Sequence, residues 1–430
     1  MTRRVVRKRS HGDGGIDQRG ENTFRLRYRV NGKRFAKTFR GPLTEARKEL
    51  RKLLKAKDDG LAVEPSKLTL AGWITLWIDS GAPGPKNKRK VGQRTLERYE
   101  QLLKEHVVPV LGATALQVLQ ASAIDKLYAG LDGKVIRDEL APRTARHVHT
   151  VFNACLGMAE LKRLVAVNPM RFVGQIPNPN PGKPEAVDLE ADDVDGADEV
   201  DEHDEGLSEA ELKTLVTGFK PSSLYPIIVL AAATGARRNE VLALRWSDLD
   251  ADKKTLRIER AWEHTKKFGL RLKPPKTERG RRSIDLDEAT IAVLLAEKDR
   301  LQRIVAGVPD GVDVDLSLVK LPARALMFPA LPEPGNGCVL TAPRVPRNVS
   351  KEFRRRADLL KFKGIKLHTL RGVHATALLD AGIGVHIVAK RIGDDPATLL
   401  RWYAKRKRTQ AADTAVSAAL TSLAAGFLGK

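Results

Sequence analysis

The sequence predicts an α+β multidomain protein. A small sheet with one helix is followed by a helical domain, and then by a mainly helical domain with a small antiparallel sheet. Three observations support this fold class. The chain has 430 residues, which is long for a single domain. Apolar residues alternate near the N-terminus and recur at three- and four-residue intervals over most of the rest. A stretch rich in acids, proline and glycine separates the two helical parts.

The N-terminal sheet is predicted by residues 24–30, where apolar side chains alternate with arginines. This period of two is typical of a strand with one apolar face and one charged face. The Asn-Gly pair at 31–32 suits a type I′ hairpin turn that leads into a second strand, 33–40. A helix is expected next, because leucine and alanine recur at helical spacing over 43–54. These elements make a first domain over residues 1–62.

The charged face of the first strand consists of Arg25, Arg27 and Arg29. Like charges side by side on one strand face repel each other, so their grouping requires an explanation. One interpretation is that they only keep an edge sheet soluble. The other is that a phosphate backbone neutralises them. We favour the second interpretation because the whole chain is strongly basic.

A second domain, residues 66–177, is predicted to be entirely helical. Its segments 95–111, 113–131 and 142–164 each carry apolar residues at three- and four-residue intervals. Two histidines at 147 and 149 could suggest a metal pair. Because residues two apart on a helix point in different directions, we expect them to be packing or solvent-facing histidines instead.

Residues 178–206 are predicted to be a flexible acidic linker. They are rich in proline, glycine and acid and contain almost no large apolar residues. From 185 to 205 there are 12 acids and no lysine or arginine, so the rest of the chain is more basic than the average suggests. Two roles remain open. The linker is either an inert spacer or a competitor for a basic groove of the protein.

A third domain, residues 207–410, begins at a capping box that starts with Ser208. Strand-like patterns at 254–262 and 270–286 lie between helical patterns, which predicts a small sheet inserted near the start of the domain. After it, residues 411–430 carry apolar side chains at helical spacing. This C-terminal helix is expected to pack either on its own domain or on a neighbouring copy of the chain.

The charge balance predicts a polyanionic partner. Lysine and arginine number 76 against 53 acids, a net charge of +23. Nucleic acid is the simplest such partner, and a merely solvated basic surface is the alternative. The two cysteines form no disulfide or metal-binding pattern, which suits a reducing cytoplasm. No apolar run approaches the length of a membrane span, so we expect a cytoplasmic protein without a membrane partner.

Five residues in the third domain suggest a reaction, although each alone has an ordinary explanation as surface charge, packing or a helix cap. Together they suit chemistry on a phosphodiester. They are Arg237, Lys276, His368, Arg371 and Tyr403.

Arg237 and Arg371 can hold the non-bridging oxygens of a phosphodiester with charge-assisted hydrogen bonds. Their charge matters most when the pentacoordinate phosphorane gathers negative charge. Tyr403 can attack phosphorus, and His368 can take the phenol proton. Lys276 can give a proton to the departing 5′ oxygen. The predicted reaction uses no cofactor and no metal ion.

Four segments of the sequence resemble the motifs of the tyrosine recombinase (phage integrase) family. TGARRNEVLALRWSDLD resembles its first arginine box, and PPKTERGRRSIDL resembles its β-strand lysine motif. HTLRGVHATALLDAGI resembles its His-x-x-Arg box, and LLRWYAK resembles its nucleophile segment. The order and spacing of these segments make the resemblance specific, and it covers nearly the whole chain.

The resemblance assigns a role to each predicted domain. Residues 1–62 correspond to an arm-type DNA-binding domain, a small N-terminal three-stranded sheet plus helix. Residues 66–177 correspond to a helical, SAM-like core-binding DNA-binding domain. Residues 207–410 correspond to the tyrosine recombinase catalytic domain. The C-terminal helix at 411–430 corresponds to a tail that often contacts a neighbouring subunit.

The resemblance implies a site-specific DNA recombinase, the integrase of a phage or another mobile element. It would cleave and rejoin double-stranded DNA at attachment sites through a 3′-phosphotyrosine intermediate and a Holliday junction. It would act as a homotetramer on DNA, with an accessory directionality or DNA-bending factor as a possible partner. Two alternatives remain: a catalytically weakened or inactive DNA-binding relative, and a relaxing enzyme similar to type IB topoisomerases.

The main departure from the family pattern lies shortly before the tyrosine. Members usually carry histidine or tryptophan about nine residues before the tyrosine, directly after a glycine, and here that residue is Asp394. An anion beside a developing phosphorane is unfavourable. Three interpretations are open. Asp394 is held protonated and donates a hydrogen bond, or it points outward, or the enzyme is weakened.

Overall fold

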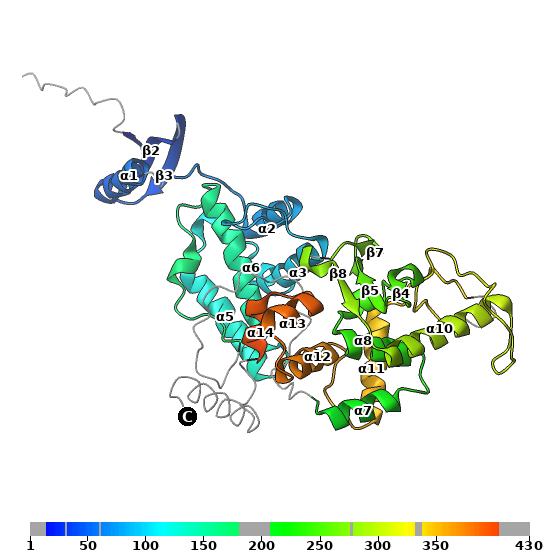
Figure 1. Cartoon of the computed structure of the whole chain (residues 1–430). Helices are drawn as coiled ribbons and strands as arrows, with labels where there is room; N and C mark the ends of the chain where they lie inside the picture. Colours follow the sequence, from blue (N-terminus) through cyan, green and yellow to red (C-terminus); the bar gives the residue numbers. More distant parts are fainter. Residues whose placement is uncertain are drawn as a thin grey trace, which may run out of the picture. The chain divides into compact units, whose positions relative to one another are not determined.

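The computed structural model describes six stretches of the chain, and the fold is that of these stretches alone. They are residues 14–30, 32–59, 62–179, 207–275, 278–331 and 338–403. The predicted fold class is confirmed, since helices are combined with small antiparallel sheets (Figure 1). The chain divides into two compact units, Met1–Gly196 and Ala197–Lys430, which are described separately.

The first unit begins with a three-stranded antiparallel sheet in the order β1-β2-β3. The strands are Gly15–Gly20, Thr23–Val30 and Lys33–Arg40, and the helix α1 spans Leu43–Asp58. One face of β2 packs on α1, and its buried side chains are Phe24, Leu26, Tyr28 and Val30. The three arginines between them are exposed. The period-two pattern therefore places apolar and charged residues on opposite faces, as predicted.

A tight connection joins β2 to β3. Val30 pairs with Lys33, so two residues make the turn. Gly32 has a φ of +78°, in the left-handed region that such turns require. The other turn residue, Asn31, lies outside the described part of the chain.

The rest of the first unit, as far as residue 179, is mainly helical. Its α-helices are α2 Leu70–Asp79, α3 Gln93–Leu102, α4 Val108–Leu111, α5 Ala121–Ile136 and α6 Pro142–Leu161. They enclose a core that includes Trp77 and Phe152. His147 packs edge-on against the ring of Tyr99, and His149 Nδ1 lies 2.9 Å from the Tyr128 hydroxyl. Burial lowers the pKa of each histidine to about 4, so both are neutral packing residues.

Two predicted segments fall outside the description. The acidic linker predicted at 178–206 lies beyond it from residue 180 onward. The C-terminal helix predicted at 411–430 lies beyond it entirely.

The second unit combines helices with two small sheets. Its helices are α7 Glu209–Gly218, α8 Tyr225–Thr234, α9 Arg238–Val241, α10 Glu288–Ala306, α11 Pro346–Leu359, α12 Thr369–Asp380, α13 Val385–Ile392 and α14 Pro396–Tyr403. One sheet has the order β4-β5-β8, formed by Leu249–Asp250, Thr255–Ile258 and Arg282–Asp285. A hairpin pairs β6 Ala261–Thr265 with β7 Gly269–Lys273.

The helix α8 organises the second unit because it is buried and apolar along most of its length. It contacts α12 and α10 (Figure 1). The predicted capping box at Ser208 is present at the start of α7, where the side chains of Ser208 and Glu211 each bond to the other's backbone N–H. In the described stretches, no helix has both the length and the apolar character needed to cross a membrane.

Candidate active site

The site is built where α8 ends. Its last residue is followed by Gly235, which has a φ of +62°. A Cβ atom added there would lie 2.9 Å from the His374 ring and 3.1 Å from the Ile392 side chain. Glycine is therefore required both by its backbone conformation and by the close approach of α12 and α13. This turn places Arg237 directly before the short helix α9.

Arg237 is held on one side and open on the other. Its Nη1 atom donates to the carbonyl oxygen of Gly393 at 3.1 Å and to Glu240 Oε1 at 3.3 Å. Its side chain is 41% exposed. A fixed guanidinium that remains partly exposed to solvent is suited to bind an external anion.

Arg371 lies on α12 and is 5% exposed. Its Nη1 atom donates to the carbonyl oxygens of Gly235 at 2.8 Å and Ile392 at 2.6 Å. Burial, together with the nearby charge of Arg237, lowers the pKa of Arg371 to about 10. It is therefore still charged at neutral pH, and its guanidinium plane is fixed by two carbonyls from separate elements.

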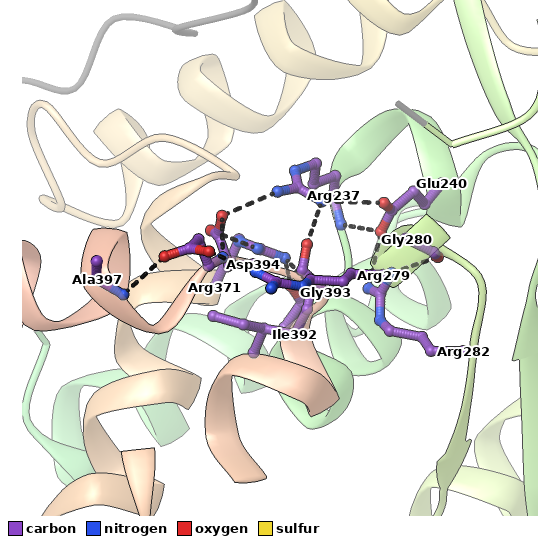
Figure 2. A network of polar contacts seen from close by, with 12 residues as sticks. Arg237, Glu240, Arg279, Gly280, Arg282, Arg371, Ile392, Gly393, Asp394 and Ala397 are labelled. Carbon is purple, nitrogen blue, oxygen red and sulfur yellow. Dashed lines mark hydrogen bonds and ion pairs between the residues drawn. The ribbon is translucent and has the colours of Figure 1, made fainter. Parts of the chain in front are cut away.

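Asp394 lies between these two arginines (Figure 2). Its Oδ2 accepts from Arg371 Nη2 at 2.8 Å, and its Oδ1 is 3.6 Å from Arg237 Nη2. Arginine can only donate, so Asp394 acts as an acceptor here. One of the three interpretations of this residue is therefore wrong in this structure, because Asp394 does not point outward but faces both arginines. Donation of a hydrogen bond to a bound phosphate and a weakened enzyme both stay predictions.

A buried ion pair between Glu240 and Arg282 holds Arg237 in place. Glu240 Oε2 accepts from the backbone N–H of Arg237 at 3.0 Å and from Arg282 Nη2 at 2.9 Å. The side chains of Glu240 and Arg282 are each 4% exposed. Burial alone would raise the pKa of Glu240, but the charges of Arg282 and Arg237 outweigh it and hold that pKa below its usual value.

Sequence reasoning missed both members of this ion pair. The available signal for Glu240 is its position three residues after Arg237 at the start of a helix, where a glutamate can bond back to the backbone. Arg282 carries no comparable signal. It looks like one of several arginines in a basic hairpin, and only the fold shows that its Nε donates to the Arg391 carbonyl at 2.8 Å.

A second acid connects the site to α14. Asp395 Oδ1 accepts from the backbone N–H of Ala397 at 2.9 Å and so caps the first turn of this helix. Asp395 Oδ2 also pairs with Arg279, which precedes β8. The connection between β7 and β8 is thereby linked to the start of the helix that ends at Tyr403.

The five predicted catalytic residues are placed as follows. Arg237 and Arg371 come together at Asp394. His368 is the half-buried residue directly before α12, and its carbonyl oxygen accepts from the Arg371 backbone N–H at 3.0 Å. Tyr403 is the last residue of α14, and its side chain is outside the description, as is Lys276 entirely.

The other predicted site residues, Arg25, Arg27 and Arg29, lie in the first unit on the exposed face of β2. Where the chain is described, no group of three or more histidine, cysteine or acidic side chains could hold a metal ion.

Comparison with known sequences identifies relatives, although no protein-family profile matches the chain. An integrase of Streptomyces ambofaciens is 27% identical over 317 residues, which cover 70% of this chain and 73% of that protein. A tyrosine recombinase XerC-like protein of Caldanaerobacter subterraneus subsp. tengcongensis is 22% identical over 377 residues, covering 84% and 86%.

Comparison with solved structures identifies the same fold. The Tn1549 transposon integrase in complex with circular intermediate DNA has a TM-score of 0.58 at 17% identity, covering 82% of this chain and 99% of that one. A lambda integrase dimer bound to a COC′ core site has a TM-score of 0.51 at 16% identity, covering 95% and 98%. With the sequence relatives, these findings show that the chain is similar in sequence to integrases and tyrosine recombinases and has the fold of the integrases of known structure.

Proposed function

We propose that this recombinase cleaves and rejoins double-stranded DNA through Tyr403, while Arg237 and Arg371 hold the scissile phosphate. The observation that supports this proposal is that both arginines face the carboxylate of Asp394. The distance to the nearest carboxylate oxygen is 2.8 Å from Arg371 Nη2 and 3.6 Å from Arg237 Nη2. Two non-bridging oxygens of a phosphodiester present the same charge sign and a similar spacing of acceptors. The geometry that binds Asp394 is therefore suited to bind one phosphate.

The reaction requires five groups. The Tyr403 oxygen forms a bond to phosphorus while the bond from phosphorus to the 5′ oxygen breaks. His368 takes the phenol proton, and Lys276 gives a proton to the departing oxygen. The product is a 3′-phosphotyrosine and a free 5′-hydroxyl. Attack by a 5′-hydroxyl of the partner duplex reverses these steps and releases Tyr403.

The buried network serves this reaction by fixing charge before the substrate arrives. Arg371 is held by two carbonyls, and Arg237 is held by Glu240 and by the Gly393 carbonyl. Donors that are already oriented need no rearrangement when the phosphorane gathers negative charge. The arginine pair is therefore expected to contribute more to the transition state than to ground-state binding.

The first unit would bind DNA through the arginine face of β2. Arg25, Arg27 and Arg29 project from one exposed face, and Arg27 makes a 2.9 Å ion pair with Asp17. The pair is largely solvent-exposed and contributes little to stability, so a phosphate can replace Asp17 at small cost. This face supplies affinity for the DNA backbone.

The names of the relatives support a biological setting. Their names include integrases and a putative prophage integrase of Mycobacterium tuberculosis. We accordingly place this protein in the cytoplasm, on the attachment sites of a phage or another mobile element. Four copies would act together on two duplexes, and an accessory directionality or DNA-bending factor would complete the assembly.

Covalent trapping tests the proposed chemistry and requires no defined target sequence. The full chain is incubated with a library of random-sequence duplexes that each carry one nick, so that a short cleaved strand diffuses away. Covalent complexes are recovered under denaturing conditions and sequenced. We expect a defined family of sites, and we expect Tyr403→Phe to give no complex. Tyr225→Phe, at a packing tyrosine of the same unit, is the matched control and should trap normally.

Two other results would change the assignment. If folded wild-type protein gives no covalent complex but protects a defined sequence, the protein is an inactive DNA-binding relative. If it relaxes supercoiled plasmids of any sequence through Tyr403, it is a relaxing enzyme similar to type IB topoisomerases.

A further inference from the structure

Asp394 uses the same atoms of the arginine pair that a phosphate would use. Both Arg371 Nη1 and Arg237 Nη1 are engaged by protein groups, mainly backbone carbonyls. The Nη2 atoms of both residues face Asp394 (Figure 2). A phosphodiester bound at these Nη2 atoms would compete with the carboxylate, because two anions at the same pair of donors repel each other. Binding of one therefore weakens binding of the other in this position.

The physical reason for an acid here is the charge of the pair itself. Arg371 is buried, and the charge of Arg237 further lowers its pKa. A buried guanidinium next to a second cation needs an anion, and Asp394 supplies one from within the chain. Asp394 follows Gly393, which has a φ of +70° and ends α13, so the chain turns the carboxylate toward the arginines.

Displacement of Asp394 would also be felt by α14. The backbone N–H of Asp395 donates to Asp394 Oδ1 at 3.2 Å. Asp395 in turn caps the first turn of α14 and pairs with Arg279. Asp394 is thus bonded to Asp395, the residue directly before α14. The helix α14 ends at Tyr403.

We propose that Asp394 is an internal anion that occupies the phosphate position on Arg237 and Arg371, so that the scissile phosphate displaces it and thereby shifts the start of α14. The proposal rests on the proposed function for the identity of the displacing phosphate. The competing interpretation is that Asp394 only stabilises the fold. The two differ in one respect: a displaced acid gives up its contacts when an anion binds and so alters the start of α14, whereas a purely structural acid keeps them.

Sulfate is the probe, because it is tetrahedral and anionic and needs no target sequence. Its binding to the full chain is followed as the rise in thermal unfolding temperature, with chloride at equal ionic strength as the reference. We expect Asp394→Asn to reach half-saturation at about tenfold lower sulfate than wild type, which corresponds to about 1.4 kcal/mol. The amide keeps the shape of the side chain but removes its charge.

Asp358→Asn is the matched control, because it removes one negative charge from an exposed position on α11 of the same unit. The general stabilising effect of sulfate is common to all three proteins and cancels in the comparison. Equal sulfate responses in wild type, Asp394→Asn and Asp358→Asn would overturn the proposal.

A second measurement uses wild-type protein alone and remains valid if Asp394→Asn fails to fold. Amide hydrogen exchange is measured in saturating sulfate and in chloride. We expect faster exchange in the first turn of α14, around Ala397, and no change in α11. Equal amide exchange rates at α14 in saturating sulfate and in chloride would contradict the proposal. Neither measurement needs catalysis, so a failure here is separate from a failure of covalent trapping.

Discussion

The arginines of this protein occur in two contrasting settings. In the second unit, Arg371 and Arg282 are 5% and 4% exposed, and each is fixed by several hydrogen bonds. On β2 of the first unit, Arg27 is 60% exposed and pairs with one acid. Under the proposed function, the same side chain would serve two purposes. Buried arginines would fix the geometry for one phosphate, whereas exposed arginines would supply affinity for many.

The contrast follows from the cost of burying charge. A guanidinium removed from water is tolerated only where carboxylates and carbonyls replace its hydration, and those partners also fix its orientation. An exposed arginine keeps its water and its rotational freedom, so its neighbours impose little on it. The two settings should therefore respond differently to the same substitution.

The largest expected effect is on stability. Glu240→Ala leaves Arg282 buried without its carboxylate, which should lower the free energy of unfolding by about 3–5 kcal/mol. Glu352→Ala is the control, because Glu352 pairs with exposed or half-exposed arginines on α11 and its loss should cost about 0–1 kcal/mol. Urea denaturation of the two variants measures both values. Equal losses would contradict the distinction between the two settings.

The next effect is on catalysis. Arg371→Lys should reduce the rate of covalent complex formation by about 10²–10³-fold, because one ammonium cannot bond two carbonyls and a phosphate in fixed directions. Arg27→Lys should change this rate little, since a point charge on an exposed strand face still attracts the backbone. Single-turnover trapping with the recovered DNA sites measures both variants. A normal rate for Arg371→Lys would show that fixed geometry is not needed.

A smaller effect per residue is expected on the salt dependence of DNA binding. Replacement of Arg25, Arg27 and Arg29 by alanine should make the dependence of log affinity on log salt concentration less steep by about 2–3. Each lost phosphate contact removes the release of about one counterion from the DNA. The control replaces three exposed basic residues of α1, which are Arg47, Lys48 and Arg51. Binding of a random-sequence duplex at several salt concentrations gives the slopes. Equal slopes in both variants would show that the arginine face of β2 contacts DNA no more than the exposed basic residues of α1 do.

The last comparison concerns pH dependence near the arginine pair. His374 Nδ1 contacts the Ala232 carbonyl at 3.0 Å, and its Nε2 lies 3.2 Å from Arg391 Nε, which donates to it. Burial, with the charge of Arg391, lowers the pKa of His374 to about 4. The folded protein therefore binds fewer protons than the unfolded chain between about pH 4 and pH 6.5.

The sign of the pH effect follows from this difference in bound protons. Stability is full above about pH 6.5 and falls as the pH approaches about 4. In His374→Gln, urea midpoints should lose part of this dependence relative to wild type. If the urea midpoints of wild type and His374→Gln differ by the same amount at every pH, the prediction is wrong.

The sequence could predict much of the fold, for reasons visible at particular elements. The alternation over 24–30 determined which face of β2 is buried, because successive side chains on a strand point in opposite directions. The capping box at Ser208 determined where α7 begins, because its contacts are local. The motif segments identified Arg237 and Arg371 because their chemistry is recognisable without coordinates.

Only the tertiary structure decided what surrounds those arginines. The carbonyls of Gly235 and Ile392, the ion pair of Glu240 with Arg282, and the inward direction of Asp394 all join residues that are distant in the sequence. Local patterns depend on backbone geometry over a few residues, and so they can be read from the chain directly. Long-range partners depend on how the elements pack. Burial makes an unpaired charge unfavourable, so each buried charge is stable only where packing brings an oppositely charged or hydrogen-bonding group to it.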